Sequence, residues 1–252
     1  MNPTIETTAL TKQYNDTVAV DGLNLSIPRG TIYGFLGPNG AGKTTTMEML
    51  VSLVTPTSGN ATVNGVSITD RDALREQIGY LPATPPLYDH LSAREQLHLT
   101  AKLRNIPPED AAERIEGLLG EFEWSDAADE PTGDYSTGMR QATAFIQAIL
   151  HEPPVLFLDE PTNGLDPRAA RTIRDHLTAL AENGTTIFLS THILPVVEEI
   201  ADDVGILYEG RLVVEDTPDA LIHRRGTTEE STLEDVFLEL TTDDTTTGWG
   251  GE

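Results

Sequence analysis

A glycine-rich stretch from Gly37 to Thr45, reading GPNGAGKTT, carries the residue types and spacing with the clearest chemical meaning. Its diagnostic positions fit the phosphate-loop pattern Gly-x-x-x-x-Gly-Lys-Thr: Gly37, Gly42, Lys43 and Thr44. Glycines let successive backbone N–H groups turn inward and close around a phosphate chain without a Cβ in the way. The lysine of this pattern reaches the β and γ phosphates, and the threonine hydroxyl can ligate Mg²⁺. The stretch therefore predicts a nucleotide site.

The flanking sequence supplies the context that this pattern requires. Residues 31–36 read as a buried strand, and residues 45–54 carry apolar side chains at helical spacing. A helix after the loop adds its positive N-terminal end to the anion site, which disfavours the alternative of a plain glycine-rich turn. We expect the whole loop to contact the nucleotide: Gly37, Pro38, Asn39, Gly40, Ala41, Gly42, Lys43, Thr44 and Thr45.

Two adjacent carboxylates, Asp159 and Glu160, follow the apolar run at residues 155–158. Such a run is typical of a buried parallel strand, and open α/β sheets bind their ligands at the carboxyl ends of strands. His192 likewise follows a β-type run at residues 185–190. A carboxylate pair could form a surface turn, and a lone histidine is more often structural. The positions after apolar strands favour the functional interpretation for all three residues.

Composition limits the classes of protein to which the chain can belong. The formal net charge of −25 over 252 residues is opposite to the basic footprint of nucleic-acid binders. Dispersed acidic charge with intact apolar periodicity is typical of proteins kept soluble at very high salt, so we expect a halophilic source. Without cysteine there is no disulfide or thiol chemistry. No apolar run approaches the ~20 residues needed to span a bilayer.

The rest of the chain predicts a β/α core with a helical insertion. Residues 1–30 read as short strands, and Ser92 and Glu95 form a capping box for a helix through Arg104. Further segments are expected as helices: 107–122, 135–150, 167–183 and 231–240. Residues 204–208 and 211–215 are expected as a hairpin. We predict one domain over residues 1–240, with a helical subdomain at about 84–150 and a disordered tail at 241–252.

Taken together and in this order, the motifs resemble the ATP-binding cassette of ABC transporters from Tyr14 to the C-terminal helix. The resemblance implies an α/β fold: a P-loop NTPase core of ABC type with an antiparallel β subdomain and an inserted helical subdomain. Tyr14 matches the aromatic residue that stacks on adenine, although on pattern alone it could equally pack within a sheet. Residues 156–160 match Walker B, and Asn163 to Asp166 match the loop that contacts the other subunit of a cassette dimer. His192 matches the switch histidine.

Two places depart from the usual family pattern. One is the signature motif, and the other is residue 83, which follows the segment 78–82 that leads into the Q-loop in this family. Tyr135 to Met139 matches the motif that usually reads Leu-Ser-Gly-Gly-Gln, with Thr137 in place of its first glycine. Ser136 and Gly138, which hold the γ-phosphate in the family, are present. The surrounding YSTGMRQ and the terminal STLEDVFLELT resemble the exporter branch that pairs with type-2 permeases. Ala83 stands where the family has the Q-loop glutamine, which implies a relaxed coupling contact.

The resemblance assigns a chemical role to each motif. The backbone of residues 40–44 would cradle the phosphates and Lys43 would neutralise the β and γ oxygens. Thr44 and Asp159 would hold Mg²⁺, with Asp159 acting through water. Glu160 would act as general base or orient the attacking water, and His192 would hydrogen-bond the γ-phosphate.

The implied protein is an ATP-hydrolysing subunit that powers export of an unidentified substrate. Its partners would be a transmembrane permease and a second ATP-binding cassette, identical or not, with no nucleic acid. It would lie in the cytoplasm, bound to the inner face of the cell membrane by its contact with the permease. Two alternatives remain: a permease-free cassette ATPase that acts on ribosomes or DNA, and a regulatory cassette that binds ATP without hydrolysing it.

Overall fold

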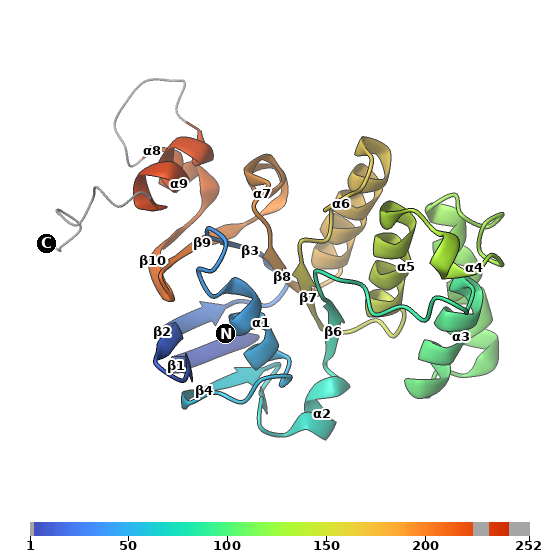
Figure 1. The fold of residues 1–252 in the computed structure, drawn as a ribbon, viewed down its shortest axis with the longest axis horizontal. Helices are drawn as coiled ribbons and strands as arrows, with labels where there is room; N and C mark the ends of the chain where they lie inside the picture. Colours follow the sequence, from blue (N-terminus) through green and yellow to red (C-terminus); the bar gives the residue numbers. More distant parts are fainter. Residues whose placement is uncertain (1–2, 224–231, 242–252) are drawn as a thin grey trace, which may run out of the picture.

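The structure, a computed structural model, describes residues 3–223 and 232–241, and a six-stranded sheet forms its centre (Figure 1). The strands lie in the order β10-β9-β3-β8-β7-β6. Neighbours from β6 to β9 are parallel, and β10 is antiparallel to β9. The strand bounds are β3 Ile32–Leu36, β6 Ile78–Leu81, β7 Val155–Asp159, β8 Thr186–Ser190, β9 Asp203–Tyr208 and β10 Arg211–Asp216.

A second, antiparallel sheet has the order β2-β1-β4-β5. Its strands are β1 Ile5–Tyr14, β2 Thr17–Ile27, β4 Ser58–Val63 and β5 Val66–Ser67. Helix α1 (Lys43–Leu50) contributes Met47, Met49 and Leu50 to an apolar cluster that includes side chains of both sheets. The short strands expected over residues 1–30 are in fact 10 and 11 residues long. Buried and exposed residues alternate over residues 5–8 of β1 and 23–27 of β2, as expected for strands with one face against the core.

The remaining helices cover the central sheet and build a helical region at one end of the molecule. Their bounds are α2 Arg71–Arg75, α3 Ala93–Leu103, α4 Pro108–Glu121, α5 Thr137–Ile149, α6 Pro167–Glu182, α7 Leu194–Ile200, α8 Pro218–His223 and α9 Leu233–Thr241, with a 3₁₀ turn η1 at Thr132–Asp134. Helices α3, α4 and α5 lie together beside β6 and β7 (Figure 1). Over residues 3–223 and 232–241, no helix is long and apolar enough to cross a bilayer.

Several predicted elements are confirmed, and the differences have local causes. The capping box at Ser92 is present, with both reciprocal hydrogen bonds to Glu95. Helix α1 begins earlier than predicted and ends at Leu50, because Ser52 adopts a left-handed backbone with φ of 62°. Strand β6 and helices α7 and α8 were not predicted. Helix α9 includes Thr241, at which the predicted tail (241–252) begins, whereas residue 231 and residues 242–252 lie outside the described residues.

Alanine substitutions at two glycines, one buried and one exposed, test how tightly β6 packs against α5. A Cβ on Gly79 would lie 2.2 Å from the backbone oxygen of Ala148, whereas a Cβ on Gly117, on the exposed face of α4, would meet nothing within 4 Å. We expect Gly79→Ala to lower the free energy of unfolding by about 1–3 kcal/mol through overpacking. Gly117→Ala should raise it by up to about 1 kcal/mol through helix propensity. Urea denaturation followed by circular dichroism measures both, and equal midpoints would contradict this packing.

Candidate active site

The loop between β3 and α1 borders a cavity of about 320 Å³ at the carboxyl ends of the parallel strands. The cavity is lined by ten residues: Ala19, Asn39, Gly40, Gly42, Lys43, Thr44, Thr45, Ala83, Asp159 and Glu160. Most of them were predicted as nucleotide or metal contacts from the phosphate-loop and carboxylate motifs. Ala83, the position of the expected glutamine, also lines the cavity. A methyl group there offers the cavity neither a hydrogen-bond donor nor a metal ligand.

The backbone of the loop takes conformations that favour glycine. Gly40 and Gly42 have φ of 82° and 107°. A Cβ on Gly42 would lie 2.2 Å from the backbone oxygen of Ala19 on β2, so the second sheet presses directly against the start of α1. The N–H groups at this helix start have no intrahelical acceptors and carry the positive end of the helix dipole. This geometry suits the binding of phosphate oxygens.

Lys43 is held against the loop that it follows. Its Nζ donates to the backbone oxygens of Gly37 at 2.6 Å and Pro38 at 3.1 Å. Burial lowers the pKa of the Lys43 ammonium, while the carboxylates of Glu160 and Asp159 raise it. An ammonium held by two neutral carbonyl oxygens can exchange them for charged phosphate oxygens, to which its hydrogen bonds are stronger.

Oxygen groups suited to Mg²⁺ meet at the cavity wall. Thr44 Oγ1 donates to Asp159 Oδ2 at 2.9 Å, and Asp159 is almost completely buried at the end of β7. Ser190 pairs with Asp159 across the neighbouring strands, and its buried Oγ has no hydrogen-bond partner among the described residues. Hydroxyl and carboxylate oxygens are the ligands that Mg²⁺ prefers, often through retained water. The residues therefore fit the ion, which when bound would neutralise charge on the phosphate oxygens.

Glu160 is fixed in place from several sides. Its backbone N–H donates to Ser190 O at 2.8 Å, although the residue has a left-handed φ of 51°. Its Oε2 accepts from Thr191 Oγ1 at 3.1 Å, and its Oε1 lies 2.8 Å from His192 Nδ1. Gln141 Nε2 on α5 donates to Glu160 O at 3.1 Å. A carboxylate held this way at the cavity edge can orient a water molecule or accept its proton.

Gln141 and Thr191 were missed as positioning residues by the sequence analysis. Each is almost completely buried, at 2% and 1% exposure. Gln141 sits within the apolar stripe of α5, and a buried polar residue in such a stripe needs a hydrogen-bond partner. A polar residue within an apolar stripe is the sequence signal that could have identified Gln141. Thr191 lies between the end of β8 and His192, where no periodicity distinguishes it.

The signature residues and Asp166 lie outside the cavity lining. Ser136 begins α5, and its Oγ accepts from Met139 N at 3.3 Å. A Cβ on Gly138 would lie 3.3 Å from Leu165 Cδ2, so the start of α5 packs on the loop before α6. Asp166 caps α6 by accepting from the backbone N–H groups of residues 168 and 169.

Tyr14 is both a strand residue and an exposed aromatic. It ends β1, pairs with Thr17 on β2, and keeps 43% of its surface exposed. Lys12 Nζ lies 4.9 Å from the ring centroid. The ring does not line the cavity, so its predicted contact with a base stays a prediction.

Comparison with known proteins decides the family. The sequence model of the ABC transporter family matches residues 20–163, more than half of the chain. The chain belongs to the ABC transporter family. It is an ATP-binding subunit of this family, whose cassettes hydrolyse ATP. Among similar proteins, the bacitracin transport ATP-binding protein BcrA of Enterococcus faecalis is 42% identical over 228 residues, covering 90% of this chain and 73% of the relative.

Other relatives and solved structures agree with this assignment. The daunorubicin/doxorubicin resistance ATP-binding protein DrrA of Streptomyces peucetius is 40% identical over 214 residues, 84% of this chain and 65% of the relative. A solved ATP-binding subunit of an ABC transporter matches with a TM-score of 0.88 at 31% identity, covering 94% of this chain and 99% of that one. A dimeric ATP-binding cassette in a post-hydrolysis state with ADP and Pi has a TM-score of 0.79 at 25% identity, covering 84% and 98%.

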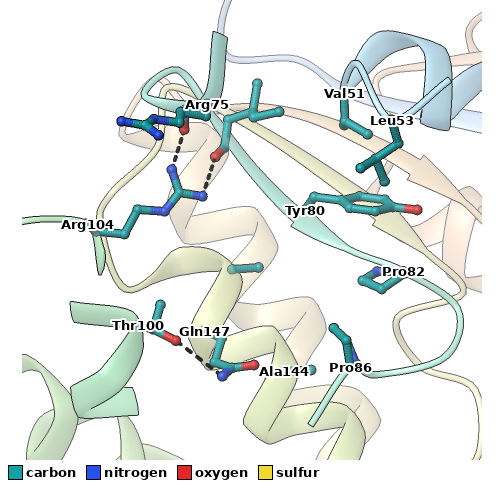
Figure 2. Close-up of a pocket in the computed structure, with 12 residues that line it drawn as sticks. Val51, Leu53, Arg75, Tyr80, Pro82, Pro86, Thr100, Arg104, Ala144 and Gln147 are labelled. Carbon is teal, nitrogen blue, oxygen red and sulfur yellow. Dashed lines mark hydrogen bonds between the residues drawn. The ribbon is translucent and has the colours of Figure 1, made fainter. Parts of the chain in front are cut away.

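This ABC cassette has a second hollow, of about 320 Å³, between β6 and the helical region. Figure 2 shows Leu53 and Tyr80 on one side of it and Thr100 and Arg104 on the other. Arg104 donates to the backbone oxygens of residues 75 and 78, which fixes the end of α3 to the start of β6. Leu53 is 63% exposed at its rim. We call this hollow the groove.

A threonine series tests whether Thr191 positions the carboxylate of Glu160 in this ABC ATPase. Thr191→Val removes the hydroxyl that donates to Glu160 and accepts from Ile193 N. We expect kcat for ATP to fall about tenfold, because a hydrogen bond to a charged group contributes about 1.5–3 kcal/mol. The dissociation constant for ATP should not change. Thr191→Ser, which keeps the hydroxyl, should restore kcat; equal losses in both variants would contradict the role.

Proposed function

We propose that this subunit hydrolyses Mg-ATP in the cavity at Lys43 and so drives export through a separate permease. The observation that carries the proposal is the meeting of Lys43, Thr44, Asp159 and Glu160 at one cavity. Lys43 and the loop N–H groups hold the phosphates, and Thr44 and Asp159 hold Mg²⁺. Glu160 activates water, and His192 contacts the γ-phosphate once nucleotide is bound.

Two copies complete each site in this proposal. Ser136 and Gly138 do not line the cavity of their own chain, yet Ser136 begins a helix whose N-terminus suits an anion. A head-to-tail pair of cassettes would bring them, with Asp166, to the nucleotide of the other copy. The solved dimeric cassettes that resemble this chain support such a pair. Tyr14 then stacks on the adenine of its own site.

The groove is the surface that we assign to the permease. It lies beside the segment from Pro82 to Pro86, which also carries Ala83 at the phosphate cavity. An apolar segment of the permease bound in the groove would therefore contact residues 82–86, the same short segment that borders the phosphate cavity. Leu53, which is exposed at the rim of the groove, suits an apolar partner.

The relatives and the net charge support a proposal for the substrate and the source of the transporter. The relatives are named for bacitracin transport and daunorubicin/doxorubicin resistance, which favours export of an antibiotic-type compound. The net charge of −25 supports a halophilic source. We place the subunit in the cytoplasm, at the membrane through its permease, and treat residues 1–240 as one domain with the helical insertion at about 84–150.

Two substitutions test hydrolysis and dimerisation together. Glu160→Gln should lower ATP turnover about 10²- to 10⁴-fold, the usual contribution of a general base. In molar salt with Mg²⁺ it should also accumulate an ATP-dependent dimer, measured by analytical ultracentrifugation. Lys43→Ala should abolish ATP binding, measured by calorimetry. Turnover at the parent rate in Glu160→Gln would indicate another base, and ATP binding without turnover in the parent would favour the regulatory alternative.

A charged substitution in the groove tests the permease contact. Leu53→Glu places a carboxylate at the apolar rim, so co-purification with the partner permease should be lost. ATP turnover of the isolated subunit should not change. The control is Val213→Glu on β10, a residue that is also exposed, at 42%, but does not line the groove. Equal co-purification of both variants would contradict the assignment of the groove.

A further inference from the structure

A closed ring of hydrogen bonds joins α3, the segment that precedes it, and the turn η1. Gln96 Oε1 accepts from Tyr88 N at 2.9 Å, and Gln96 Nε2 donates to Thr132 Oγ1 at 2.8 Å. Thr132 Oγ1 donates in turn to Tyr88 O at 3.1 Å. Gln96 and Thr132 are 1% and 0% exposed. We call these three residues the polar ring.

The hydrogen bonds of the polar ring restrict how its segments can be placed relative to one another. The Gln96 amide uses both of its ends, and the Thr132 hydroxyl both donates and accepts. Loss of one member would leave buried polar atoms of the others unpaired, which costs more than the bond itself contributes. A buried network with all of these bonds made therefore specifies one relative placement of its segments.

A second set of contacts extends the ring to the signature helix. Arg140 on α5 donates through Nη1 to Thr132 O at 2.7 Å and to Asp89 Oδ1 at 2.8 Å. The backbone adds two bonds, from Thr132 N to Leu91 O and from Gly133 N to Asp89 O, each 2.9 Å long. Residues 88–91 and 132–140 are thus held together at several points.

The joined segments lead to two different functional surfaces. Residues 82–91 leave β6 at the phosphate cavity, pass the groove at Pro82 and Pro86, and reach the ring at Tyr88. On the other side, Thr132 lies four residues before Ser136, the cap of the signature helix. A shift of the segment at the groove must therefore carry the start of the signature helix with it or break buried hydrogen bonds.

We propose that Gln96 and Thr132 are positioning residues that set the signature Ser136 relative to the groove, and thereby link permease contact to closure on the other copy's nucleotide. The inference rests on the two-copy site and groove assignment proposed above. Because Ala83 has no polar side chain to connect groove and cavity directly, the link runs through the polar ring to the signature helix. Such a link acts only if the ring fits the closed dimer better than the open one.

A threonine series with a matched control tests the ring. Thr132→Val removes the central hydroxyl, and Thr132→Ser keeps it. Thr186 is the control: it is also 0% exposed, and its Oγ1 bonds backbone atoms of residues 28 and 30, away from the ring. In a Glu160→Gln background, Thr132→Val should raise the dissociation constant of the ATP-dependent dimer about tenfold. Thr132→Ser and Thr186→Val should leave it at the parent value, and ATP affinity should be the same in all variants.

An exposed ion pair provides a second test that does not depend on core stability. Asp89→Asn weakens the 2.8 Å contact to Arg140, where the acid is 72% exposed. Asp129→Asn is the matched control, since Asp129 is 73% exposed and lies 2.8 Å from Arg94 in the same helical region. We expect only Asp89→Asn to weaken the ATP-dependent dimer. Equal effects of the two acid variants, or of Thr132→Val and Thr186→Val, would overturn the proposal.

A third test, with Ser136→Ala, separates failure of this inference from failure of the proposed function. Ser136→Ala should itself weaken the ATP-dependent dimer, because it removes a signature hydroxyl from the shared site. If it does so while Thr132→Val has no effect, the two-copy site stands and the polar ring has no positioning role. If Ser136→Ala leaves the dimer unchanged, the assignment of the signature motif is wrong, and the inference fails with it.

Discussion

The hydrogen bond from Thr44 to Asp159 joins residues 115 positions apart, and the site depends on the sheet that makes it possible. Strands β3, β8 and β7 are parallel neighbours, with Ser190 in register with both Phe35 and Asp159. Their carboxyl ends therefore lie level along one edge. The phosphate loop follows β3 at that edge. Asp159 and Glu160 lie at the end of β7, and Thr191 and His192 follow β8. A one-residue slip of β7 would turn Asp159 to the opposite face of the sheet.

The sequence allowed prediction of the elements whose pattern is local and strong. The phosphate loop follows from the spacing of its glycines and Lys43, and β7 follows from a continuous apolar run. Strand β6 was missed because only four residues form it, and Gly79 and Tyr80 interrupt its apolar character. Its place comes from pairing with β7, which is a tertiary contact. Contacts such as Gln141 to Glu160 O depend on how α5 packs on β7, which periodicity cannot specify.

The departure at Thr137 is accommodated within the chain. Most signature motifs have glycine at this position, and the side chain of Thr137 must find space beside the loop before α6. It does so against Gly164, where a Cβ would lie 2.9 Å from Thr137 Cγ2. Gly164 also has a φ of 74°, a conformation that glycine adopts without strain. The space at one position therefore compensates for the added bulk at the other, and the cap at Ser136 keeps its geometry.

Glu160 adopts a left-handed backbone, which costs a non-glycine residue about 1–2 kcal/mol. Glycine would relieve that strain, yet it would delete the carboxylate that faces the phosphate cavity. A substitution that raised the free energy of unfolding at this position would therefore remove the group that the proposed hydrolysis requires.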